Sequence, residues 1–261
     1  MTAPVEETTA GAAVPVEVLT DEELSVLAPP GSIVVMPFLD SVEDDAEREL
    51  VRRTAYRSLL ARGIVDPPTP EATSAAIARG DGHVELMVRD DVRSVVTLRQ
   101  AARMVVAVAR TTVAAQDFWY AHVVDDVVLL EEVSGDGLHR FALADVAALP
   151  GLVSEATVHP EAGDAEGEPV PLEAELGDPT PPDELLERLG SAVLRSDVLV
   201  RYVGDAEPVL LGLFTGPAGS WVTRAQQGET PVTVPSAAED ARAAVRDLVD
   251  DAFAQVTIRG L

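Results

Sequence analysis

The chain of 261 residues carries 45 carboxylates against 19 arginines and contains no lysine, asparagine or cysteine. The formal charge of −26 repels phosphate backbones and anionic lipid surfaces, so we expect neither a nucleic-acid partner nor membrane insertion. The missing lysine and cysteine exclude a Schiff base, a cysteine nucleophile and a thiolate metal site.

The N-terminal region begins with a polar, acidic stretch, residues 1–13, that has no hydrophobic periodicity and is predicted to be disordered. Valines then alternate with Pro15 and Glu17 from Val14 to Val18, which is typical of an edge strand. Thr20 and Glu23 have the spacing of a helix capping box. The apolar run Ile33 to Phe38 predicts a further short strand.

Two helices are expected next. Ser41 with Asp44 can cap the first, whose opening turn is acidic and which ends at Gly63. Thr69 followed by Pro70 starts the second, which ends near Gly80.

The region from His83 to Val133 favours strands. His83–Arg89 alternates, and the apolar runs Phe118–Val124 and Val127–Val133 predict a hairpin that turns at Asp125–Asp126. The stretch Asp91 to Ala115 fits a helix or a strand, and we favour a helix followed by a strand. Leu138–Leu143 then predicts a third strand, followed by a short helix that ends at Pro150.

A change of composition divides the chain after this point. Residues 161–182 contain seven carboxylates and five prolines, which is typical of a linker or long loop. The following segments are predicted as a helix, four strands and a final helix capped by Ser236: Pro182–Gly190, Val193–Val203, Val209–Phe214, Trp221–Ala225, Val232–Val234, and 236–253.

The order helix, hairpin, strand and helix therefore occurs on both sides of the linker. We predict an α+β fold of two quasi-repeated halves, residues 14–160 and 183–261, whose antiparallel strands form a central sheet flanked by helices. Such halves could share one sheet across a pseudo-two-fold axis, which would cover their edge strands.

No pattern in the chain indicates catalysis, a metal or a cofactor. The four histidines lie outside metal-binding helical spacing, although His122 and His139 could approach each other across neighbouring strands. Pairs of carboxylates arise from composition alone in so acidic a chain, and Asp125–Asp126 is most simply a turn. We therefore expect no catalytic residue, no metal and no cofactor.

The aromatic residues are the remaining candidates for a site. Alternation on a strand points Phe118 and Tyr120 to one face and Trp119 to the other. Core packing explains them most simply, but an exposed tryptophan is also a typical interface anchor. We name four candidate partner-binding residues: Trp119, Tyr120, Phe214 and Trp221.

The first 150 residues resemble the EspG-like proteins of actinobacterial type VII (ESX) secretion. The resemblance lies in the run Leu19 to Leu27 (LTDEELSVL), in the helix end Leu59 to Val65 (LLARGIV), in the hairpin, and in the strand and helix that lead to Pro150. The rest of the chain is similar only in its element order. The resemblance implies a cytosolic, non-enzymatic chaperone that binds the hydrophobic tip of a helical PE–PPE substrate pair.

Two other functions stay open. An acidic immunity-type protein would neutralise a basic partner through a carboxylate surface, and its binding would depend steeply on salt. An enzyme of another class would need a deep pocket with converging carboxylates, or His122 beside an acid. The longest apolar run, Met104 to Ala109, is too short to span a bilayer and the N-terminus lacks the basic start of a signal peptide, so we expect a cytoplasmic protein.

Overall fold

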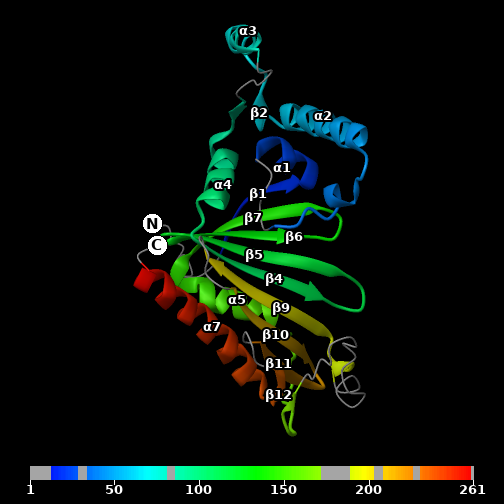
Figure 1. The fold of residues 1–261 in the computed structure, drawn as a ribbon, viewed down its shortest axis with the longest axis vertical. Helices are drawn as coiled ribbons and strands as arrows, with labels where there is room; N and C mark the ends of the chain where they lie inside the picture. The colour runs from blue at the N-terminus through cyan, green and yellow to red at the C-terminus, as the bar shows by residue number, and fades with distance from the viewer. Residues whose placement is uncertain are drawn as a thin grey trace, which may run out of the picture.

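The computed structural model describes residues 13–28, 34–80, 86–171, 189–202, 208–225 and 230–259. Ten antiparallel strands form one twisted sheet in the order β1-β7-β6-β5-β4-β9-β10-β11-β12-β8, with helices packed on both faces (Figure 1). The predicted α+β class is confirmed. Within the described ranges, no helix is both long and apolar enough to cross a membrane.

Two four-stranded meanders make up most of the sheet. Each is built from consecutive hairpins and is followed by a helix, α5 (Leu149–Thr157) or α7 (Ala238–Arg259). The first meander contains β4 (Met104–Thr111), β5 (Gln116–Val124), β6 (Val127–Val133) and β7 (Leu138–Asp145). The second contains β9 (Leu194–Tyr202), β10 (Val209–Gly216), β11 (Gly219–Ala225) and β12 (Val232–Ser236).

The meanders meet where β4 pairs with β9 in antiparallel register, from Met104 opposite Tyr202 to Thr111 opposite Arg195. This β4–β9 seam makes one sheet from two similar halves, as the repeated element order predicts. The helices that follow the meanders, α5 and α7, pack against each other.

The two faces of the sheet have different covers. Face A carries Val106, Leu130 and Val198, and α5 and α7 pack over it, mainly on β4 and β9 to β11. Face B carries Leu129 and Phe141, which join a core with residues from the N-terminal helices. The face A core therefore spans both meanders, and the face B core covers the first.

The N-terminal segment adds an edge strand and the cover of face B. β1 (Val14–Thr20) pairs with β7 at the sheet edge, and α1 (Asp21–Leu27) follows with the predicted Thr20–Glu23 capping box. α2 (Asp45–Ala61) packs on α1, and α4 (Asp90–Ala101) packs on β5, β6 and β1. The predicted helix followed by a strand within 91–115 is therefore confirmed as α4 and β4.

Smaller elements complete the chain. β2 (Val65–Asp66) and β3 (Met87–Val88) form a separate two-stranded ladder, and α3 (Pro70–Arg79) projects beyond it at the top of Figure 1. At the opposite edge, β8 (Val170–Pro171) pairs with β12.

Two of the predicted elements are wrong. The described part of Ile33–Phe38 is not a strand, because side chains satisfy its backbone: Val35 N–H donates to Tyr120 Oη and Phe38 N–H donates to Asp21 Oδ2. A short 3-10 turn, Leu39–Ser41, follows it. The helix expected to end at Pro150 instead begins there, since a proline in the first turn of α5 removes no helical hydrogen bond.

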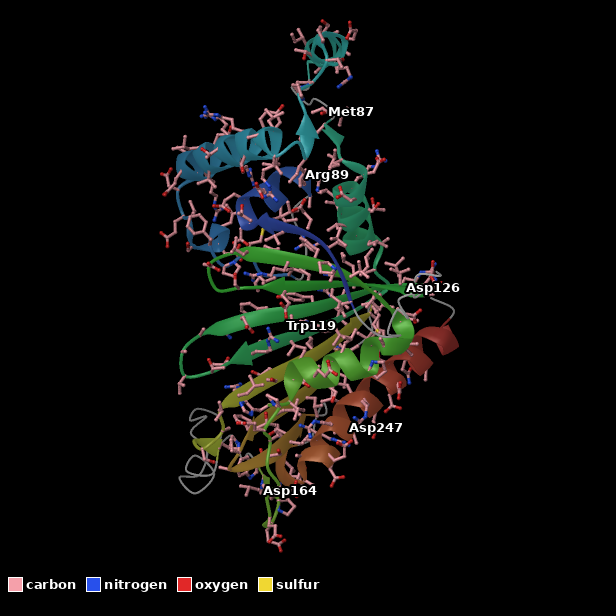
Figure 2. The ribbon with its side chains drawn as sticks, turned by 180° about the vertical axis from the view of Figure 1, so that it is seen from behind. Met87, Arg89, Trp119, Asp126, Asp164 and Asp247 are labelled. Carbon is pink, nitrogen blue, oxygen red and sulfur yellow. The ribbon has the colours of Figure 1, made fainter. Side chains whose placement is uncertain are left out.

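Three boundaries also differ from the prediction. Asp44, not Ser41, caps α2 through Glu47 N–H. Ser236 belongs to β12, and Asp164 Oδ1 instead accepts a hydrogen bond of 2.8 Å from Ala238 N–H at the start of α7. Figure 2 shows Asp164 at that end of the molecule. The strand predicted over 83–89 is described only from residue 86 and is paired only at β3.

Other predictions lie outside the described residues. They concern nearly all of the N-terminal stretch 1–13, much of the linker 161–182 and most of the helix 182–190. The division of the chain into these segments stays a prediction.

Candidate functional site

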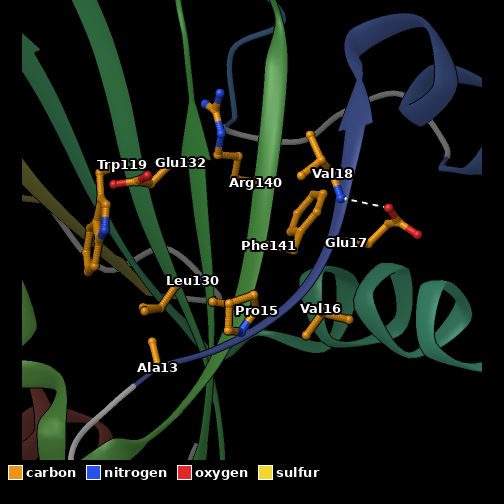
Figure 3. Close-up of a pocket in the computed structure, with 11 residues that line it drawn as sticks. Ala13, Pro15, Val16, Glu17, Val18, Trp119, Leu130, Glu132, Arg140 and Phe141 are labelled. Atoms are coloured by element: carbon orange, nitrogen blue, oxygen red, sulfur yellow. Dashed lines mark hydrogen bonds between the residues drawn. The ribbon is translucent and has the colours of Figure 1, made fainter.

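A groove lies on face A over the outer strands of the first meander (Figure 3). Its volume is about 560 Å³ and its lining is mostly apolar. The residues that line it are Ala13, Pro15, Val16, Glu17, Val18, Trp119, Leu130, Glu132, Arg140, Phe141 and Ala142. We name it the β1 groove.

Cross-strand pairing explains the shape of the β1 groove. One row across the strands runs through Val18, Arg140, Glu132 and Trp119, which are direct register partners. The next row runs through Pro15, Ala142, Leu130 and Ala121. The short side chain of Ala142 leaves room for the groove, and the longer side chains of the first row line it beside this residue.

The edge strand β1 forms the outer side of the groove. Val18 is 42% exposed although it is apolar, and the register of β1 shifts between Pro15 and Glu17. The guanidinium of Arg62 donates a hydrogen bond of 2.7 Å to the carbonyl of Val18. Arg62 and the proline thus blunt this edge against pairing with another strand, while its apolar side chains stay accessible.

The four candidate aromatic residues do not gather in one place. Trp119 is 5% exposed, belongs to the face A core and lines the groove; Figure 2 shows it near the middle of the sheet. Tyr120 lies buried on face B. Phe214 and Trp221 are register partners in the second meander, on the face opposite Leu213 and Val222. Their role in binding a partner stays a prediction.

A buried network of charged side chains lies on face B beneath α1 and α4. His139 Nε2 is 2.6 Å from Asp21 Oδ1, and its Nδ1 is 2.7 Å from Glu131 Oε1. Glu131 Oε2 lies 2.7 Å from His122 Nε2 and accepts a 3.0 Å hydrogen bond from Arg99 Nε. The network joins α1, α4, β5, β6 and β7.

His122 and His139 both contact Glu131, so the predicted approach of the two histidines across neighbouring strands is confirmed. Glu131, Asp21 and Arg99 were not predicted as members of a site. A signal for Glu131 was present, because it shares a strand face with the apolar Leu129 and Val133, where an acid must be buried and therefore paired.

The geometry determines the protonation of His139. Both ring nitrogens lie within hydrogen-bond distance of carboxylates, so both donate and the ring is a cation. Burial alone would lower the pKa of His139, but its hydrogen bonds to Asp21 and Glu131 outweigh burial and raise the pKa above 6.5. Burial alone would raise the pKa of Glu131, but hydrogen bonds from both histidines and the charge of Arg99 bring it well below 4.5.

These shifts predict a window of pH in which the network stabilises the fold most. The contribution of Glu131 is present above its unfolded pKa of 4.5 and is lost as the pH falls through the folded value. The contribution of His139 is present below its unfolded pKa of 6.5 and is lost as the pH rises through the folded value. We expect the difference in unfolding free energy between the wild type and His139→Gln to be largest between pH 4.5 and pH 6.5.

Urea denaturation of both proteins across the pH range measures this difference. A difference in unfolding free energy that stays constant with pH would show that the pKa of His139 is the same in the folded and unfolded states.

The network has the residue types of an acid–base catalytic site, but a substrate in the β1 groove would not reach them. Glu131, His122 and His139 are almost completely buried, and none of them lines the β1 groove. Among the described residues, no three histidine or acidic side chains are arranged to hold a metal ion. The network is therefore placed to hold α1 and α4 on the sheet.

Comparison with known proteins gives a likeness to solved structures but no match to a family model. No family model matches the sequence, and no curated protein is significantly similar to it. Among solved structures, the chain is similar to the Mycobacterium tuberculosis type VII secretion system chaperone EspG5, in a complex with the PE25–PPE41 dimer. The sequences are 14% identical, the TM-score is 0.43, and the match covers 75% of this chain and 93% of the other.

Proposed function

We propose that the protein is a cytosolic, non-enzymatic chaperone or adaptor that binds a hydrophobic segment of a secreted helical protein, of the PE–PPE kind handled in type VII secretion. The observation that carries this proposal is the β1 groove, an apolar hollow beside a blunted edge strand whose Val18 side chain is accessible. The class of partner comes from the sequence resemblance of the first 150 residues.

The physical properties of the groove suit this role. Its volume is large enough for several apolar side chains of one helix face, and a helix laid into a groove is a common mode of peptide recognition. The blunted outer edge of β1 disfavours an added strand and so favours a helical occupant. The charge of −26 would keep a complex with an aggregation-prone segment soluble.

The test compares two substitutions on the same strand. Val18→Asn introduces a polar group into the lining of the groove, whereas Val14→Asn changes a valine that is 63% exposed and does not line it. Each variant is co-expressed with helical secreted pairs encoded beside this chain, and the affinity of the captured complex is measured by titration.

We expect Val18→Asn to weaken binding about tenfold, because an apolar contact at the centre of an interface is worth on the order of 1–2 kcal/mol. Val14→Asn should bind like the wild type. Equal affinity of all three proteins, or capture of no helical pair, would contradict the proposal.

A further inference from the structure

The β1 groove contains a cation that has no partner. Arg140 lies on β7 in the row between Val18 and Glu132, and its side chain is exposed. Within the part of the chain that the structure describes, it makes no hydrogen bond or ion pair. Arg52, Arg57, Arg201 and Arg224 also lack a side-chain partner among the described residues, but of these five arginines only Arg140 lines the β1 groove.

The two acids that line the groove each lie near an arginine other than Arg140. Glu17 accepts a hydrogen bond of 2.9 Å from Arg62 and is also paired with Arg89. Glu132 is the direct register partner of Arg140, yet it lies 3.6 Å from Arg110 on the other side. Among the charged side chains that line the groove, Arg140 is therefore the one that has no partner within the described residues.

We propose that Arg140 selects an apolar helical segment that carries a carboxylate next to its apolar face, and that it fixes the position of this segment in the groove. This inference rests on the proposed function and specifies the chemistry of its partner. The planar guanidinium can hold a carboxylate through two parallel hydrogen bonds, which restricts orientation as well as adding affinity. A bound segment would also exclude water and strengthen the contact.

The same geometry disfavours a basic segment. A lysine or arginine at this position would meet the guanidinium of Arg140, and the two like charges would repel each other. The overall charge of −26 would repel acidic partners at long range. Arg140 therefore acts on the selectivity of the docked complex and not on its rate of encounter.

Three synthetic helical peptides test the inference. They share leucines at positions i, i+3, i+4 and i+7 and differ in one flanking residue, which is glutamate, glutamine or lysine. Binding of each labelled peptide to the full chain is measured by fluorescence anisotropy. We expect the glutamate peptide to bind about tenfold more tightly than the lysine peptide.

Arg140→Glu should reverse this order of affinity. Arg201→Glu is the matched control, because Arg201 is also exposed on a strand but lies on face B. It should leave the order unchanged.

The other outcomes overturn the inference in separable ways. If all three peptides bind equally and Val18→Asn weakens each of them, the groove binds helices but Arg140 does not select charge. If no peptide binds, or if Val18→Asn has no effect on peptides that do bind, the proposed function fails as well. If laurate binds the groove and the peptides do not, the occupant is a lipid-like acid and the inference is wrong.

Discussion

Replacing Glu131 with alanine should lower the free energy of unfolding by about 3–5 kcal/mol, because it removes the partner of three buried side chains. Arg99, His122 and His139 all contact this carboxylate, and Arg99 and His139 are cations. Without it, two buried positive charges would be left with Asp21 as their nearest remaining acid in the network. Urea denaturation measures the change directly.

The neighbouring residue provides the control. Glu132 is exposed on the opposite face, and its nearest cation, Arg110, is 3.6 Å away, so Glu132→Ala should change the unfolding free energy by no more than about 1 kcal/mol. If the two alanine variants lose the same stability, the buried network contributes nothing beyond ordinary surface pairing. A domain of this kind is typically stable by about 5–15 kcal/mol, so the expected loss for Glu131→Ala is large.

Trp119→Ala is expected to have an effect of similar size, about 3–5 kcal/mol of unfolding free energy, because a large buried ring would be replaced by a cavity. Trp119 is only 5% exposed and packs in the face A core, although it also lines the β1 groove. Thermal unfolding followed by circular dichroism would show the shift.

Trp119→Phe separates the two roles of this residue. Phenylalanine keeps an aromatic ring at this position, so we expect Trp119→Phe to lose less than about half of the stability that Trp119→Ala loses. Partner binding can then be measured on a folded protein. A Trp119→Ala variant that unfolds like the wild type would show that the ring is not part of the core, and would favour a purely surface role.

The sequence predicted those elements whose boundaries depend on local chemistry. The Thr20–Glu23 capping box, the Asp125–Asp126 turn and the glycine at the end of α3 are each recognisable within a few residues. Asp125 adopts a positive φ of 52°, as hairpin turns of this kind require. The repeated order of elements also indicated the shared sheet.

The features that the sequence did not predict depend on contacts between distant segments. Asp21 appears in sequence as one more acid in a helix start, and only the fold places it against His139 and the backbone of Phe38. The cap of α7 comes from Asp164, far back in the chain. Arg140 is notable only because the fold places it beside the β1 groove without a partner among the described residues, which no sequence pattern reveals.

The β4–β9 seam has a consequence for synthesis on the ribosome. The first meander can close hairpin by hairpin as it leaves the exit tunnel, since each of its strands pairs with the next. The free side of β4 must then wait until Tyr202 and its neighbours have been translated. During that interval the nascent chain exposes the unpaired edge of β4, which can pair with strands of other polypeptides. Slowing translation before residue 194 should therefore increase aggregation of the nascent chain.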